Sequence, residues 1–291
     1  MRNPTIALFL AVFCAYVCTG QMGTLTKGSV TSDSIELTTR LILPERPLKQ
    51  KPPVLIIIHG SGNKGNWNTY QPFVRRFTDQ GIAVVFFDKR GTGESCGDFL
   101  EVSVENSEEV FDMLGNDVAA VAQWTKQQAG IDTTRIGVLG FSEEGGWVAP
   151  LAVQKSPIIT YAIMISGPFS SVGQEFLYNE LTGEDKSRPA IAMDSVYDKM
   201  WELEEGMGYD PYPHVAKLDS APSLWLFGEK DTNMAVDFSQ DRLKTMVAEY
   251  PEKRFHYKTY YNANHSLYDV DTKQRLPYGK YIRRWMLLEL Y

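Results

Sequence analysis

The sequence predicts a domain of the α/β class, in which a mostly parallel central sheet is flanked by helices. Three observations lead to this prediction. The chain of 291 residues is long enough for one large domain. Short apolar runs rich in Val, Ile, Leu and Phe recur along it, as in strands buried on both faces. Segments with the apolar spacing of helices separate these runs, and such alternation is typical of βαβ units and a parallel sheet.

The N-terminus has the pattern of an export signal. Arg2 is followed by a short apolar run that ends in small residues near Gly20, which is the order of a cleaved signal peptide. The run is short for a membrane span. We therefore expect residues 1–20 to be removed and residues 21–291 to form a single exported domain, periplasmic or secreted, with no stable membrane span. An uncleaved anchor, or lipid attachment at Cys18, stays open.

The predicted elements then follow in order. Residues 34–43 alternate apolar and polar side chains before running apolar, as in an antiparallel edge strand. Further strands are expected at 54–58, 82–87, 135–139, 158–165, 222–227 and 254–261, and helices at 70–80, 108–128, 147–154, 234–250 and 280–290.

Residues 167–220 break this alternation. The segment is rich in acidic residues, Met and aromatics, and we interpret it as a small, partly helical cap insertion over the strand ends. A plain surface elaboration is the alternative. Its aromatic side chains suit either an apolar substrate pocket or a small core of the insertion itself.

Composition limits the classes of partner and cofactor. The net charge is −7 and no basic cluster is present, which argues against nucleic acid as a partner. The sequence has no H-E-x-x-H or C-x-x-C pair and no phosphate-binding loop, so we expect no metal and no cofactor. Cys96 is the cysteine that remains after signal removal, and we interpret it as structural. The oligomeric state stays open.

The loops after three predicted strands carry the residue types of nucleophilic catalysis. Ser142 lies at a sharp turn from strand to helix, which suits a nucleophile. His265 follows the last strand and is the candidate base, and Asp231 is the candidate for the acid that orients it. Ligands bind at the carboxyl ends of the strands in open α/β sheets, so we expect the three side chains to meet there. Glu229 is a rival acid.

A fourth loop, His59-Gly60-Ser61-Gly62, is rich in glycine and can aim a backbone N–H at a developing oxyanion. We expect the N–H of Ser61 to act with that of Glu143, the residue after the nucleophile. The remaining histidines fit the base role less well. His59 suits a bracing role in this loop, and the other two lie in the insertion (His214) and inside a strand (His256).

These motifs resemble the α/β-hydrolase superfamily, in its prolyl-oligopeptidase-like and dienelactone-hydrolase-like branch, which includes many exported bacterial esterases. The resemblance spans about residues 34–291. The matching residues are His59-Gly60-Ser61-Gly62, Asp88-Lys89-Arg90-Gly91-Thr92-Gly93-Glu94-Ser95, Gly140-Phe141-Ser142, Gly145-Gly146-Trp147-Val148-Ala149-Pro150, Gly228 with Asp231, and Asn262-Ala263-Asn264-His265.

The resemblance implies the α/β-hydrolase fold and a serine hydrolase that acts through an acyl-enzyme. It also implies a structural role for the Asp88–Ser95 turn. We expect a carboxylic ester hydrolase with a small-molecule ester substrate. A serine exopeptidase of the same fold is one alternative, although such peptidases usually carry a propeller or a larger lid. A catalytically silent α/β-hydrolase that acts as a binding protein is the other.

Glu144 is the departure from the family pattern. Relatives commonly read G-x-S-x-G-G-W-x-A-P, and this chain has one residue more between Ser142 and Trp147. Either a bulge in the first helical turn absorbs the extra residue, or the turn is distorted and activity suffers. A carboxylate here would also oppose negative charge that develops on the substrate. If Glu144 strains the turn, Glu144→Gly should raise activity.

Overall fold

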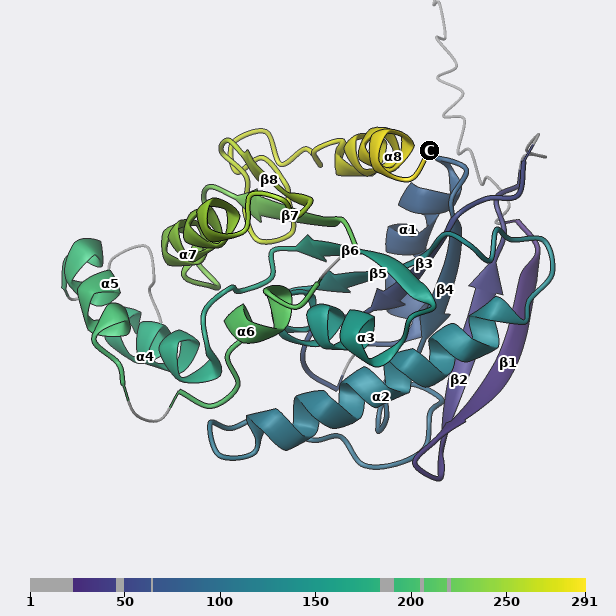
Figure 1. Ribbon diagram of the computed structural model, residues 1–291, viewed down its shortest axis with the longest axis horizontal. Helices are drawn as coiled ribbons and strands as arrows, with labels where there is room; N and C mark the ends of the chain where they lie inside the picture. The colour runs from purple at the N-terminus through teal and green to yellow at the C-terminus, as the bar shows by residue number, and fades with distance from the viewer. Residues whose placement is uncertain (1–22, 46–49, 64, 184–190, 205–206, 219–220) are drawn as a thin grey trace, which may run out of the picture.

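The computed structural model describes residues 23–45, 50–63, 65–183, 191–204, 207–218 and 221–291 (Figure 1). The predicted signal peptide, residues 1–20, lies outside the described residues. Within the described part of the chain, no helix is long and apolar enough to cross a membrane.

The centre of the molecule is an eight-stranded sheet with the order β1-β2-β4-β3-β5-β6-β7-β8. The pairings β1–β2 and β2–β4 are antiparallel and the others are parallel, which confirms the predicted fold class. The strands are β1 (Leu25–Ser32), β2 (Ile35–Ile42), β3 (Val54–Ile58), β4 (Ala83–Phe87), β5 (Ile136–Phe141), β6 (Ile159–Ile165), β7 (Ser223–Gly228) and β8 (Phe255–Tyr260).

Helices cover both faces of this sheet (Figure 1). They are α1 (Trp67–Thr78), α2 (Ser107–Lys126), α3 (Ala149–Lys155), α4 (Val172–Thr182), α5 (Met193–Trp201), α6 (Tyr212–Val215), α7 (Val236–Glu249) and α8 (Tyr278–Glu289), with a π-helix at Glu144–Val148. Successive side chains of a strand point to opposite faces, so Ile56 packs with α2 and α3 while Ile57 packs with α1 and α8. The site residues therefore stand on a sheet that is buried on both sides.

The edge strand β1 was not predicted. It pairs with β2 along its whole length, through a turn at Asp33 and Ser34 whose φ angles are +47° and +67°. Only Val30 and Ser32 of this strand are buried. Its exposed and largely polar side chains give it none of the apolar pattern on which the other strand predictions depend.

The segment between β6 and β7 contains α4, α5 and α6. Helices α4 and α5 lie beside α7 at one end of the molecule (Figure 1). Tyr178, Val196 and Met200 form a small apolar cluster there with Phe238 of α7, so part of the segment's aromatic content serves its own core. Phe176 is exposed instead and lines a cavity described below.

Candidate active site

Ser142 occupies a backbone turn that an L-residue rarely adopts. Its φ angle is +61°, in the left-handed region that costs a non-glycine residue free energy. Backbone hydrogen bonds hold it there: its N–H donates to the Ile165 carbonyl at 2.9 Å, and its own carbonyl accepts from Gly145 at 2.9 Å and from Gly146 at 3.2 Å. The chain thus passes directly from β5 into the π-helix, with Ser142 at the turn.

The structure brings Ser142, His265 and Asp231 together. His265 Nε2 lies 3.0 Å from Ser142 Oγ, and His265 Nδ1 lies 2.7 Å from Asp231 Oδ2. A carboxylate can only accept a hydrogen bond, so Nδ1 of a neutral His265 carries the proton and Nε2 is left to accept from the serine hydroxyl. This is the arrangement in which a histidine can remove the proton of a serine nucleophile.

Ser166 is a neighbour that sequence reasoning missed. Its Oγ donates to the carbonyl of His265 at 2.7 Å, and its φ angle is +49°. The hydroxyl therefore fixes the backbone that carries the histidine. Its position directly after β6, at the strand-end edge, is the signal that could have found it.

The rival candidates lie elsewhere. Glu229 accepts from the Asn262 N–H at 2.9 Å. His214 Nδ1 lies 3.3 Å from Gln154 Oε1, and His256 Nε2 lies 3.3 Å from Glu289 Oε1. His59 is fully buried, and burial, followed by the charge of Lys89, lowers its pKa to about 3. A neutral ring suits its contacts, since Nε2 accepts from the Lys89 N–H at 3.3 Å and Nδ1 can donate to the Gly60 carbonyl at 3.2 Å.

The loop after β3 lies against the turn at Ser142. A Cβ added to Gly60 would stand 3.6 Å from the Ser142 Cβ, and the Gly60 N–H donates to the hydroxyl of Tyr70 at 3.1 Å. Neither the N–H of Ser61 nor that of Glu143 donates to another group among the described residues. Both are therefore available to a substrate oxygen.

The extra residue of the turn is absorbed by the π-helix. The Ala149 N–H donates to the Glu144 carbonyl, five residues back. This hydrogen bond spans one residue more than that of an α-helix, so the turn accommodates the extra residue. Gly145 takes the crowded position: a Cβ on Gly140 would lie 2.5 Å from the Gly145 Cα, and a Cβ on Gly145 would lie 2.8 Å from the Gly140 carbonyl oxygen. Of the two alternatives for Glu144, the structure shows the bulge.

The side chain of Glu144 is buried in an ion pair with Lys89. Their exposed fractions are 3% and 4%. Lys89 also donates to the Gly60 carbonyl at 3.2 Å, so one ammonium joins the turn at Ser142 to the loop of Ser61. Burial raises the pKa of the Glu144 carboxyl, and the charge of Lys89 opposes this rise. Sequence reasoning missed this role of Lys89, since its partner lies 55 residues away.

Glu143 carries a second carboxyl beside the site. Burial and the neighbouring Glu144 raise its pKa to about 7, while Lys89, a hydrogen bond with the Ser61 side chain and His265 act in the other direction. Its charge therefore changes near neutral pH, a few ångströms along the chain from the nucleophile.

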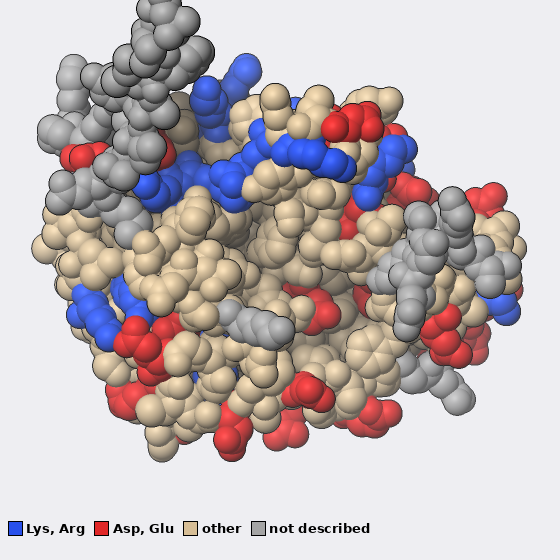
Figure 2. All heavy atoms as spheres, turned by 180° about the vertical axis from the view of Figure 1, so that it is seen from behind, with Lys and Arg blue, Asp and Glu red and all other residues tan. Residues whose placement is uncertain are grey.

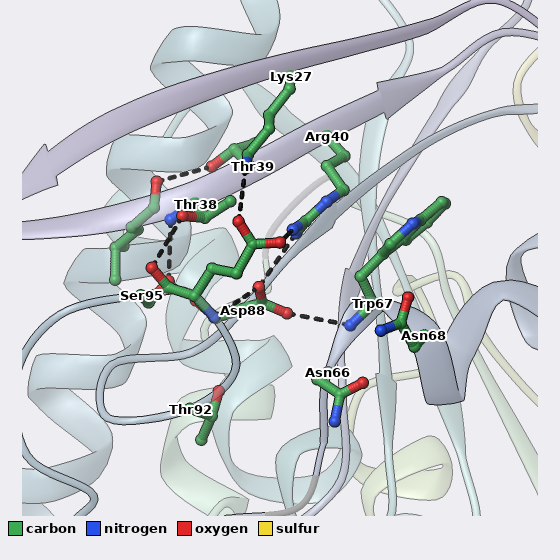
Figure 3. A network of polar contacts seen from close by, with 12 residues as sticks. Lys27, Thr38, Thr39, Arg40, Asn66, Trp67, Asn68, Asp88, Thr92 and Ser95 are labelled. Atoms are coloured by element: carbon green, nitrogen blue, oxygen red, sulfur yellow. Dashed lines mark hydrogen bonds and ion pairs between the residues drawn. The ribbon is translucent and has the colours of Figure 1, made fainter.

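Polar contacts of Asp88 and Ser95 fix the Asp88–Ser95 turn to its neighbours (Figure 3). The Asp88 carboxylate accepts from Arg40 at 3.0 Å and from the backbone N–H groups of Trp67 at 3.2 Å and Glu94 at 3.1 Å. Ser95 Oγ closes the turn by donating to the Asp88 carbonyl at 2.5 Å. The segment after β4 is thereby fixed to β2 and α1, which suits a structural role.

A cavity of about 320 Å³ opens beside the two oxyanion candidates, Ser61 and Glu143. Its apolar lining includes Phe99, Val102, Val110, Leu114, Trp147 and Phe176. The cavity can therefore hold an apolar group beside Glu143, the residue that follows Ser142. No three His, Cys, Asp or Glu side chains gather as a metal site anywhere in the described ranges.

Comparison with known proteins gives matches of three kinds. A model of the X-Pro dipeptidyl-peptidase (S15) family matches residues 33–206. An Escherichia coli protein, named as an uncharacterized 31.7 kDa protein in the traX-finO intergenic region, is 30% identical over 200 residues. That match covers 68% of this chain and 63% of the relative, so this chain spans less than two thirds of the relative's length.

Solved structures share the fold. The Pyrococcus furiosus esterase Pf2001 matches with a TM-score of 0.65 and 17% identity over 92% of both chains. The Pyrococcus horikoshii acylaminoacyl peptidase matches with a TM-score of 0.63 and 18% identity, over 92% of this chain and 42% of the peptidase.

Proposed function

Because the chain belongs to the X-Pro dipeptidyl-peptidase (S15) family, within the α/β-hydrolase superfamily of serine hydrolases, we propose that it hydrolyses carboxylic esters of small molecules. The observation that carries this proposal is the continuous hydrogen-bonded path from Ser142 through His265 to Asp231. It links the three residue types of a serine nucleophile and its base in the chain order of α/β-hydrolases.

The reaction follows from this geometry. His265 Nε2 takes the Ser142 proton as Oγ attacks the acyl carbon, and Asp231 stabilises the resulting imidazolium. The backbone N–H groups of Ser61 and Glu143 hold the oxyanion. As the intermediate collapses, His265 returns the proton to the leaving alcohol, and an acyl-enzyme remains. Water, deprotonated by the same histidine, then attacks the acyl carbon and releases the acid.

Two observations support Ser61 and Glu143 as the oxyanion donors. Each N–H is free of other acceptors among the described residues, and both residues line the same cavity. The Glu144 charge, expected from the sequence to oppose the oxyanion, is directed into the ion pair with Lys89. Losing one such donor typically costs about 10²–10³ in turnover.

A serine peptidase is the second candidate, since the matching family is described as X-Pro dipeptidyl-peptidase. The extent of the structural matches favours the ester. The Pyrococcus furiosus esterase is matched over 92% of its length, whereas the acylaminoacyl peptidase is matched over 42%.

Labelling with a fluorophosphonate tests the nucleophile. We expect the wild type to be labelled and Ser142→Ala to be unlabelled. Ser29→Ala, on the edge strand β1, serves as the control and should be labelled like the wild type. A folded wild type that takes no label would exclude catalysis by Ser142 and favour a binding protein.

Substrate preference then separates the two hydrolases. Esters of 4-nitrophenol with short acyl chains are compared with a prolyl 4-nitroanilide that carries one further N-terminal residue. We expect a higher kcat/KM for the esters, and the reverse order would establish the peptidase. A series of acyl chain lengths would measure the fit of the 320 Å³ cavity.

We also propose that the protein is exported and that residues 1–20 are removed. The support is the basic start at Arg2 and the short apolar run that follows it. N-terminal sequencing of the protein from the exported fraction should begin close to residue 21. An intact Arg2 in that fraction would instead indicate an uncleaved anchor.

A further inference from the structure

A second cavity is lined by chain neighbours of Ser142 and His265. Its volume is about 210 Å³, and no residue lines both it and the cavity of Ser61. Phe141 and Ser266 are among the residues that line it, and they directly precede Ser142 and directly follow His265 in the chain. The Phe141 and His265 rings lie 5.3 Å apart. Through Phe141, the second cavity therefore lies next to the His265 ring.

Arg76 of α1 lines this cavity without an acidic partner. Its guanidinium lies 5.1 Å from the Phe73 ring centroid and 5.4 Å from that of Tyr278, and its Nε is buried with no hydrogen-bond acceptor. It makes no ion pair with any described residue, in contrast to the buried Arg40 and Arg90. Burial and the nearby Arg275 lower the pKa of Arg76 to about 10, while a hydrogen bond with the neutral Tyr268 side chain acts in the other direction. Arg76 therefore remains a cation at neutral pH.

Arg275 brings a second positive charge to the same place. Its guanidinium donates to the Tyr268 hydroxyl at 3.0 and 2.6 Å, and Tyr268 also lines the cavity. Arg275 likewise has no ion pair within the described part of the chain. Two cations that approach one another and lack a carboxylate repel each other, and a bound anion would relieve that repulsion.

Positive charge is also concentrated on part of the wider surface. Figure 2 shows Lys and Arg side chains gathered in a band across the upper part of one face, at the height where Figure 1 places α8. Asp and Glu gather toward the lower edge of that face. The band is present although the whole chain has a net charge of −7, so an anion that approaches this side meets a locally favourable field.

We propose that this second cavity binds a carboxylate carried by the alcohol part of the ester, next to the Arg76 guanidinium. The inference rests on the proposed ester hydrolysis. His265 must protonate the leaving oxygen, so the alcohol part lies beside the His265 ring, and Phe141, which contacts that ring, lines the cavity. Tyr70, Phe73 and Tyr278 supply aromatic walls that suit a flat, apolar spacer between the ester and the carboxylate.

A matched pair of acetates tests the proposal. The substrates are 4-acetoxybenzoate, which carries a carboxylate on the leaving group, and its methyl ester, which does not. We expect the wild type to favour the carboxylate in kcat/KM by about 10- to 100-fold, the range of a hydrogen bond to a charged group. The gain should lie mainly in KM, because the guanidinium contacts substrate and transition state alike.

The ratio between the two substrates is compared among variants. Arg76→Gln should reduce it to near one, and Arg275→Gln should reduce it in part and provides a second variant if Arg76→Gln fails to fold. Arg75→Gln is the matched control, since Arg75 lies beside Arg76 on α1 but does not line the cavity, and it should keep the preference. A wild type without the preference, or an equal loss in Arg75→Gln, would overturn the proposal.

Two further measurements keep this result separate from the proposed function. If the methyl ester is cleaved through Ser142 and no preference is found, the hydrolase proposal stands and the carboxylate site fails. If neither acetate is cleaved, calorimetry of 4-hydroxybenzoate with the Ser142→Ala protein decides, and binding that Arg76→Gln abolishes supports the site. If the preference appears only when the carboxylate is on the acyl part, as in 4-nitrophenyl hydrogen succinate, the proposal that the cavity binds the alcohol part is refuted.

Discussion

Charged side chains are paired on one side of Ser142 and unpaired on the other. On the oxyanion side, Glu144 and Lys89 are both buried and neutralise each other. On the histidine side, Arg76 and Arg275 lie near one another with no carboxylate partner among the described residues. A charge that is matched inside the protein fixes the backbone around it, whereas an unmatched charge in a cavity is available to a ligand. In this protein the buried, paired charges hold two loops together, and the unpaired charges are the ones that we propose bind an anion.

Removing Lys89 should cause the largest loss of stability among the changes considered. Lys89→Met leaves the buried Glu144 carboxylate without its cation, and breaking a buried pair typically costs about 3–5 kcal/mol. Urea unfolding measures the loss. The double variant Lys89→Met/Glu144→Leu should recover most of it, because both charges are then removed together. A single variant as stable as the wild type would show that the pair contributes nothing.

Glu144→Gly tests the same side through activity. The sequence raised the hypothesis that this change relieves strain, but Gly145 already makes the close approach to Gly140. The variant instead frees Lys89 from the turn, and we expect kcat/KM on a short-chain ester to fall about 10- to 100-fold, as when a catalytic group is displaced. Glu144→Gln, which keeps a hydrogen-bond acceptor for Lys89, is the control and should fall less. A rise in rate would restore the strain hypothesis.

The carboxyl of Glu143 should make the free energy of unfolding depend on pH. Its folded pKa of about 7 lies above the ordinary 4.5, so the folded state binds the extra proton between these values. The free energy of unfolding should therefore decrease as pH rises from 4.5 to 7 and level off above 7. After allowance for partial exposure, the decrease is about 2 kcal/mol. Urea titrations across this range should show the slope, and Glu143→Gln should lack it; an identical slope in both would assign it elsewhere.

The smallest effect is expected on the unmatched side. Arg76→Gln removes two cation–π contacts but also the repulsion from Arg275, so the free energy of unfolding should change by less than about 1 kcal/mol. Thermal or urea unfolding in the absence of ligand provides the measurement. A loss of several kcal/mol would mean that Arg76 supports the fold in the way that Lys89 is expected to.

The sequence predicts those elements whose pattern is local, and it does not predict those that depend on contacts between distant segments. Strands such as Val54–Ile58 are continuous apolar runs, so the sequence alone predicts them. The order of the loops likewise predicts that Ser142 and His265 meet at the strand ends. The polar edge strand Leu25–Ser32 has no such run and owes its place to pairing with β2.

Charge pairing across the fold could not be predicted. The sequence shows that Glu144 is extra, but its partner Lys89 belongs to a different loop and meets it only when β4 and β5 take their places on either side of β3. The cavity of Arg76 is likewise formed by α1, α8 and the loop after β8, and no local pattern encodes their meeting.

The π-helix at Glu144–Val148 also affects which insertions and deletions the sequence can tolerate. One inserted residue in an α-helix rotates everything after it by about 100°, which would turn the buried faces of that helix toward solvent. The wider turn confines the disturbance to five residues, so Trp147 and Leu151 still face the core. Loss of the inserted codon would therefore return the chain to the common spacing in a single step, with the phase of α3 preserved.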